Sequence, residues 1–145
     1  MKTLTPVKKT FLLEAPLEIL HEESMEWLNE VEFWKDESAF FYTLIMQKIK
    51  KSSRALKTKD GISIENHLIY ISSEKLDDLK SEVQKHERFL AKILNDVTQD
   101  EQSYRLKHKR IATKMYDFEK EFKDMKRKIF QVVEKENSGN KILIN

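Results

Sequence analysis

The sequence predicts an all-α protein, a long antiparallel three-helix up-down-up bundle of coiled-coil type that dimerisation could complete to more helices. Two observations lead to this fold class. The 145 residues include only two glycines and two prolines, the residues that most often interrupt helices. Hydrophobic side chains also recur in alternating steps of three and four along three stretches, which is the spacing of a buried helical face.

One domain is expected at this length. Pro16 suits the first turn of a helix, Asp60-Gly61 is typical of a turn, and Ser138-Gly139-Asn140 is typical of a helix end. Thr98 and Glu101 have the spacing of a capping box. The expected segments are an extended arm at 1–15, a bundle at 16–137 with helices at about 16–56, 63–96 and 98–137, and a tail at 138–145.

The first predicted helix carries both tryptophans of the chain on its hydrophobic face. Trp27 and Trp34 are two helical turns apart, and Phe41 follows two turns later. Small serines separate these bulky rings, as expected where helices interdigitate. The predicted core face comprises Leu17, Leu20, Ser24, Trp27, Val31, Trp34, Ser38, Phe41 and Ile45.

The other two helices show similar faces. In the second helix the predicted core positions are Ile69, Ser72, Leu76, Leu79, Val83, His86, Leu90, Ile93 and Val97. In the third they are Tyr104, His108, Ile111, Met115, Phe118, Phe122, Met125, Ile129 and Val132. A tight turn near Val97 then places His86 opposite His108, and a first connection near residue 59 places that level opposite Val31 and Trp34.

Charge favours pairing between the first and third helices. Nine acids and one base lie between Glu14 and Glu37, whereas the third helix begins with a group of bases. This group, Arg105, Lys107, Lys109, Arg110 and Lys114, also suggests a nucleic-acid-associated protein as an alternative. The nearly balanced total of 27 bases and 25 acids argues against that alternative.

A metal-binding helical bundle is a second alternative. His86 and His108 share one level of the predicted bundle, and Glu82 and Glu30 lie close enough in the pattern to complete a zinc or iron site. The ferritin-like scheme, however, needs Glu-x-x-His on two helices, and only Glu18 and His21 have that spacing. The competing interpretation is a pair of histidines that hydrogen-bond at the edge of an apolar core.

Catalysis and cofactor binding leave no signature in the sequence. The chain has no cysteine, no glycine-rich phosphate loop and no nucleophile-elbow or zincin motif, so we expect a non-enzymatic protein without a cofactor. The absence of cysteine fits a reducing compartment, and no apolar run is long enough to span a membrane. We therefore expect a cytoplasmic protein without membrane contact.

The favoured function is a helical interaction or scaffold module that binds a protein partner or a second copy of itself. The first helix carries aromatic residues outside its main hydrophobic face, more than two neighbouring helices require. The predicted partner surface consists of Phe33, Phe40 and Tyr42, and the predicted aromatic core consists of Trp27, Trp34, Phe41, Phe118 and Phe122.

Overall fold

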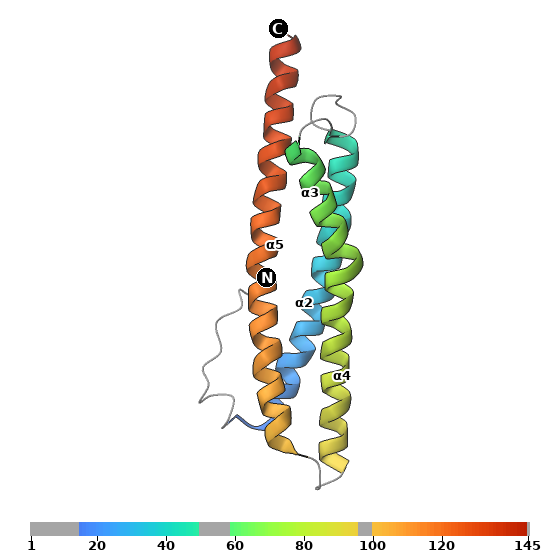
Figure 1. Cartoon of the computed structure of the whole chain (residues 1–145), viewed down its shortest axis with the longest axis vertical. Helices are drawn as coiled ribbons and strands as arrows, with labels where there is room; N and C mark the ends of the chain where they lie inside the picture. Colours follow the sequence, from blue (N-terminus) through green and yellow to red (C-terminus); the bar gives the residue numbers. More distant parts are fainter. Residues whose placement is uncertain (1–14, 50–58, 96–99, 145) are drawn as a thin grey trace. The chain divides into compact units, whose positions relative to one another are not determined.

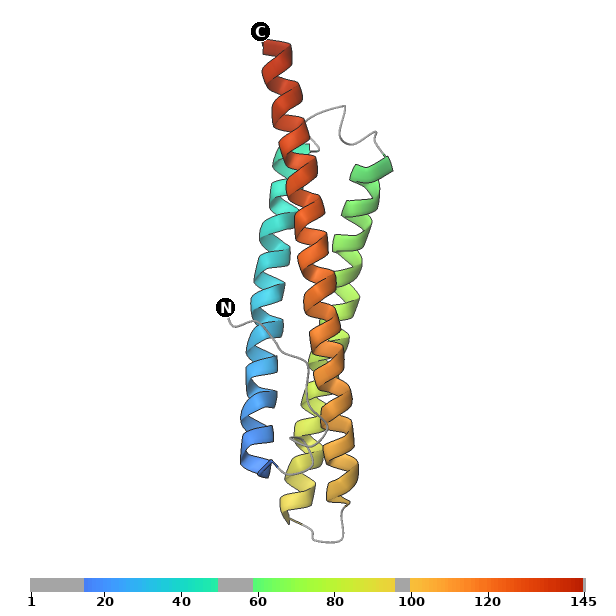
Figure 2. The same ribbon diagram turned by 90° about the vertical axis from the view of Figure 1, so that its left-hand side faces the viewer.

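The structure, a computed structural model, describes residues 15–49, 59–95 and 100–144. This part of the chain folds into helices and contains no strand, which confirms the predicted all-α bundle (Figure 1). In chain order the elements are α2 (Leu17–Leu44), the π-helical η1 (Ile45–Ile49), α3 (Lys59–Tyr70), the π-helical η2 (Ile71–Lys75), α4 (Leu76–Asn95) and α5 (Glu101–Ile144). Figure 2 shows α5 as one uninterrupted helix.

Two helix boundaries differ from the prediction. Asp60 and Gly61 lie inside α3 instead of forming a turn, and α5 continues through Ser138-Gly139-Asn140 instead of ending there. A glycine within a helix costs only about 1 kcal/mol, which neighbouring helix-forming residues can offset. The predicted arm before Ala15, the end of the first helix near residue 56 and the Thr98 cap lie outside the described residues.

The start of α5 is capped by Asp100, which was not the predicted capping residue. Its Oδ1 accepts a hydrogen bond from the Gln102 backbone N–H at 3.0 Å, and its Oδ2 accepts one from the Ser103 hydroxyl at 2.6 Å. These bonds satisfy a backbone donor that an α-helix leaves without an internal partner. The Ser103 hydrogen bonds also lower the pKa of the Asp100 carboxyl group.

The chain divides into two compact units. Unit 1 comprises Met1–Phe33 and Asp77–Lys120, and unit 2 comprises Trp34–Leu76 and Glu121–Asn145. Helices α2 and α5 each contribute residues to both units.

In unit 1 the segments of α2, α4 and α5 lie side by side in both views (Figures 1 and 2). Contacts between α2 and α4 pair His21 with Glu87 and Glu32 with Lys80. Contacts between α4 and α5 pair Glu82 with Lys114 and His86 with His108, so α4 runs antiparallel to both neighbours. The core is built from one hydrophobic face of each segment, as the three-four spacing predicts. Buried residues include Leu20, Trp27, Val31, Val83, Leu90, Tyr104, Ile111, Met115 and Phe118.

In unit 2, α2 and α5 run parallel, since Trp34 packs on Phe122 and Phe41 packs on Phe130. Glu121 on α5 ties down the other helical segment by accepting hydrogen bonds from Lys75 of η2 and His67 of α3. Burial acts to raise the pKa of the Glu121 carboxyl group, but these two hydrogen bonds outweigh it and the pKa is lowered. Buried residues include Trp34, Phe41, Ile45, Ile64, Leu68, Ile71, Phe122, Met125 and Ile129.

The π-helical segment η2 changes which residues of the preceding helix face the core. Ile69, predicted to be buried, is 42% exposed, and Ser72 is exposed as well, whereas Leu68 and Ile71 are fully buried. A π-turn accommodates an extra residue, so a three-four pattern counted back from α4 falls out of phase at η2. The predicted positions Ile69 and Ser72 were therefore wrong.

The level predicted for Trp34 was also wrong. His108 stacks on Trp27, with ring centroids 4.4 Å apart, and Trp34 instead packs on Phe122 in unit 2. The prediction placed the first connection near residue 59, but Lys59 is already the first residue of α3. Moving a connection along an antiparallel pair shifts every facing position by about twice as many residues.

Candidate functional site

A hydrogen-bonded chain of three ionisable side chains crosses the core of unit 1. His108 Nε2 lies 2.7 Å from Glu23 Oε1, and His108 Nδ1 lies 2.9 Å from His86 Nε2. The three residues come from α5, α2 and α4, one from each helical segment of the unit. The chain therefore links the whole cross-section of unit 1 through polar contacts.

The carboxylate fixes the direction of these hydrogen bonds. Because ionised Glu23 can only accept, His108 donates from Nε2, and a neutral His108 then accepts at Nδ1 from the Nε2–H of His86. Burial, His108 and Lys107 lower the pKa of His86 to about 3, so His86 is neutral at neutral pH. Its Nδ1 atom is buried without a hydrogen-bond partner among the described residues.

Aromatic rings enclose the two histidines. Tyr104 stacks on His86 with centroids 4.2 Å apart and planes 4° from parallel, and Trp27 stacks on the other histidine at 4.4 Å. Phe89 stacks on Tyr104, with ring centroids 6.3 Å apart. Phe89, Tyr104, His86, His108 and Trp27 thus form a continuous series of five rings, which we call the ring stack.

The hydrogen bonds between Glu23, His108 and His86 allow these three side chains to share protons inside the core. A carboxylate that orients an imidazole is also found in hydrolytic triads. Here, however, His86 is 1% exposed and His108 is 0% exposed, so neither ring can reach a substrate in solution. Burial also raises the pKa of the Tyr104 hydroxyl, with the Glu87 carboxylate acting in the same direction. The arrangement is that of a polar connection that aligns three helices.

The predicted metal candidates come together only in part. His86 and His108 are in contact, but Glu82 is bound by Lys114, whose Nζ lies 2.9 Å from its Oε2. The carboxylate that contacts His108 is Glu23, about two helical turns before the predicted Glu30. Within the described ranges, no three histidine, aspartate or glutamate side chains are grouped so that they could hold a metal ion.

The predicted partner surface is exposed on α2. Phe33 is 47% exposed in unit 1, and Phe40 and Tyr42 are 60% and 41% exposed in unit 2. Phe130 of α5 is 50% exposed, and its ring and that of Phe40 both meet Phe41 edge to face, at 5.5 and 5.4 Å. We call Phe40, Phe41 and Phe130 the aromatic seam.

Sequence reasoning missed Glu23 and Phe130. Glu23 lies one turn before Trp27 and belongs to an acidic run that gives it no distinguishing signal. Phe130 follows the core residue Ile129 directly and would have been found only by asking which aromatic side chains fall outside the predicted face.

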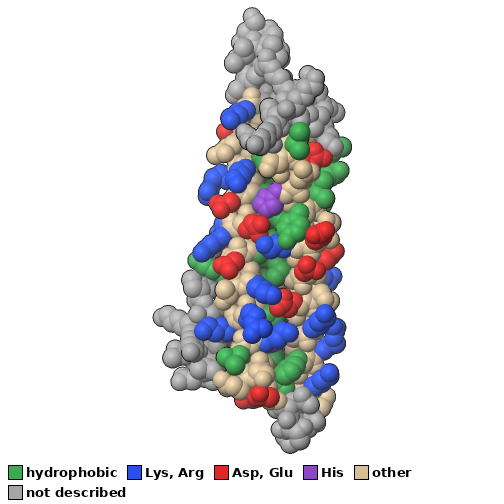
Figure 3. Space-filling model, in the orientation of Figure 1, with side chains coloured by type: hydrophobic (Ala, Val, Ile, Leu, Met, Phe, Trp, Pro, Cys, Tyr) green, Lys and Arg blue, Asp and Glu red, His purple; other side chains and the backbone are tan. Residues whose placement is uncertain are grey.

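Two of the basic residues at the start of α5 have internal partners. Arg105 donates to the Ala15 carbonyl at 2.6 Å and pairs with Glu101, and Lys114 pairs with Glu82 of α4. On the face shown in Figure 3, lysine and arginine side chains are interspersed with aspartate and glutamate. None of the helices in the described part of the chain is long and apolar enough to cross a membrane.

Comparison of the chain with protein-family models, with curated proteins and with solved structures finds no match.

Proposed function

We propose that the protein is a non-enzymatic helical interaction module that self-associates through the aromatic seam of unit 2. The observation that carries this proposal is the exposure of two phenylalanine rings, Phe40 at 60% and Phe130 at 50%, against one buried ring. Aromatic side chains are the commonest energetic anchors of protein interfaces. Because Phe40 and Phe130 both pack on the buried Phe41, their side chains lose little conformational freedom on binding.

Charge supports a second copy of the chain as the occupant. Exposed Asp36 lies one turn before Phe40 on α2, whereas exposed Arg127 lies one turn before Phe130 on α5. A two-fold axis parallel to the helices places α2 of one copy against α5 of the other. The acidic border of each seam then faces the basic border of its partner.

The energy expected from the seam is moderate. Burying a phenylalanine completely contributes about 1.5 to 3 kcal/mol, so a ring that is half exposed gains about 1 kcal/mol on association. Four such rings in a dimer therefore contribute about 3 to 6 kcal/mol. Because this gain does not exceed the entropy cost of association, the charged borders of the seam have to contribute as well, and we expect a weak, reversible dimer.

Sedimentation equilibrium over about 1 to 500 μM tests the proposal. The parent chain should dimerise, and the double variant Phe40→Ser/Phe130→Ser should stay monomeric with an unchanged helical circular dichroism spectrum. A matched control removes equally exposed side chains elsewhere, with Ile62→Ser/Leu106→Ser at 48% and 49% exposure. A parent chain that is monomeric throughout this range, or a control that weakens dimerisation as much as the seam variant, contradicts the proposal.

A further inference from the structure

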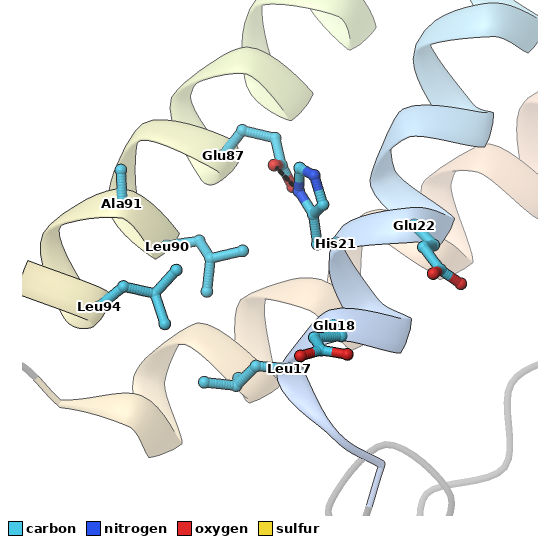
Figure 4. A pocket seen from close by; sticks show the side chains of 8 residues that line it. All are labelled: Leu17, Glu18, His21, Glu22, Glu87, Leu90, Ala91 and Leu94. Atoms are coloured by element: carbon cyan, nitrogen blue, oxygen red, sulfur yellow. Dashed lines mark hydrogen bonds and ion pairs between the residues drawn. The ribbon is translucent and has the colours of Figure 1, made fainter.

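A pocket of about 420 Å³ lies in unit 1 between the first turns of α2 and the last two turns of α4. It belongs to a different unit from the aromatic seam, so its role is independent of self-association. Its lining residues are Leu17, Glu18, His21, Glu22, Glu87, Leu90, Ala91 and Leu94 (Figure 4).

The floor of the pocket is aliphatic. Figure 4 shows the side chains of Leu17, Leu90 and Leu94 directed toward the same space from the two helices. Leu90 is buried in the core cluster of unit 1, and Leu17 packs against that cluster. Leu94 is 67% exposed, the highest value among the exposed large hydrophobic side chains of the described residues. An apolar guest would therefore cover hydrocarbon that water now contacts.

The border of the pocket is acidic. Three glutamates line it against one histidine, and His21 already pairs with Glu87 through Nδ1 and Oε2. Glu18 and Glu22 are exposed, and Figure 4 shows the Glu18 carboxylate beside Leu17 while that of Glu22 points away. The N-terminus of α2 adds only about half a positive charge, so the Glu18 carboxylate leaves the border beside Leu17 negative.

The length of the pocket sets the size of its ligand. The lining residues of α4 run from Glu87 to Leu94, which is about 10 Å at 1.5 Å per residue. That distance matches a short extended alkyl chain.

We propose that this pocket binds a small amphiphilic cation, an unbranched alkyl chain that carries a primary ammonium group. The alkyl chain lies on Leu17, Leu90 and Leu94, and the ammonium group lies at the acidic border nearest Glu18. The negative border excludes anionic amphiphiles of the same length, so the head group determines selectivity.

Three probes with the same alkyl chain test the proposal by nuclear magnetic resonance titration: octylammonium and octanesulfonate below their micellar concentrations, and octanol below its solubility. Octylammonium should give saturable shifts at the pocket residues and bind about tenfold or more tightly than octanol, with octanesulfonate weakest. Equal affinity for all three, tighter binding of octanesulfonate, or the absence of saturable shifts at the pocket overturns the proposal.

Variants separate the two parts of the site. Leu94→Lys should abolish octylammonium binding. Because Leu94 is exposed, this variant should still fold. The control Leu106→Lys changes another exposed leucine and should bind octylammonium like the parent. Glu18→Gln should weaken octylammonium binding about threefold to tenfold and leave octanol binding unchanged. The seam variant Phe40→Ser/Phe130→Ser should bind octylammonium as the parent does, and a loss of binding there would overturn the independence of the two sites.

Discussion

Acid should destabilise this protein through His86, because the folded state keeps that imidazole neutral while the unfolded state does not. Its pKa falls from an ordinary 6.5 to about 3 on folding. Between these two pH values the unfolded chain binds more protons at this residue, so stability is full above about pH 6.5 and is lost as the pH falls toward 3. At 1.36 kcal/mol per pH unit the loss is about 5 kcal/mol, a large part of the stability of a typical domain.

The perturbation that tests this reasoning is His86→Gln. Glutamine cannot take up a proton in this range, yet its amide N–H can still donate to Nδ1 of His108. The variant should lose some stability at every pH because it no longer stacks on Tyr104. Its stability should nevertheless fall less steeply with acid, by about 1.4 kcal/mol per pH unit between pH 6 and pH 4.

Urea unfolding followed by circular dichroism at several pH values measures both slopes. Carboxyl groups titrate in parent and variant alike, so the difference between the two slopes isolates His86. Gln84→Ala, an exposed substitution on the same helix, serves as the control and should keep the parental slope. Equal slopes for parent and His86→Gln would refute the assignment of a neutral buried imidazole.

Two substitutions of Trp34 and two single-residue deletions test the packing. Trp34→Ala should lower the free energy of unfolding in urea by about 3 to 5 kcal/mol, because the Trp34 side chain is 1% exposed and packs on Phe122. Trp34→Phe should lower it much less. A loss below about 0.5 kcal/mol for Trp34→Ala would contradict the core position of Trp34. Deletion of Ser73 should be tolerated, with a melting temperature within a few degrees of the parent, because removing one residue from η2 restores ordinary α-helical spacing. Deletion of Gln84 from the middle of α4 should unfold the protein, because it rotates the buried residues on one side of the deletion away from the core. Equal tolerance of both deletions would show that η2 does not determine which residues of α3 face the core.

The core face of α2 could be predicted because its spacing is regular. Leu20, Ser24, Trp27, Val31 and Trp34 are all buried, and each lies three or four residues from the next. Large side chains alternate there with small ones, so the pattern fixes the rotation of the helix without knowledge of its neighbours.

The phase of α3 could not be predicted in the same way. No residue pattern marks a π-turn, and Ile69 is as hydrophobic as the neighbours that are actually buried, Leu68 and Ile71. Which of the three faces inward depends on the five residues of η2, whose composition is ordinary.

The candidate sites depend on how neighbouring helices are aligned, which the pattern of any one helix does not determine. The pairing of His86 with His108 followed from the short connection between α4 and α5, which fixes the register closely. The level of α2 at which Glu23 contacts His108 was not predicted, because Asp60-Gly61 indicated a turn where the structure has α3. The aromatic seam joins residues about ninety positions apart, a contact that periodicity alone cannot reveal.

The contact between Trp27 and His108 gives the protein an internal optical reporter. Fluorescence from Trp27 should therefore report whether the His108 ring stays stacked on the indole. Trp34 packs on a phenylalanine and supplies a reference emission in the same molecule. Opening of the contact between Trp27 and His108 can thus be followed in dilute solution, without a label.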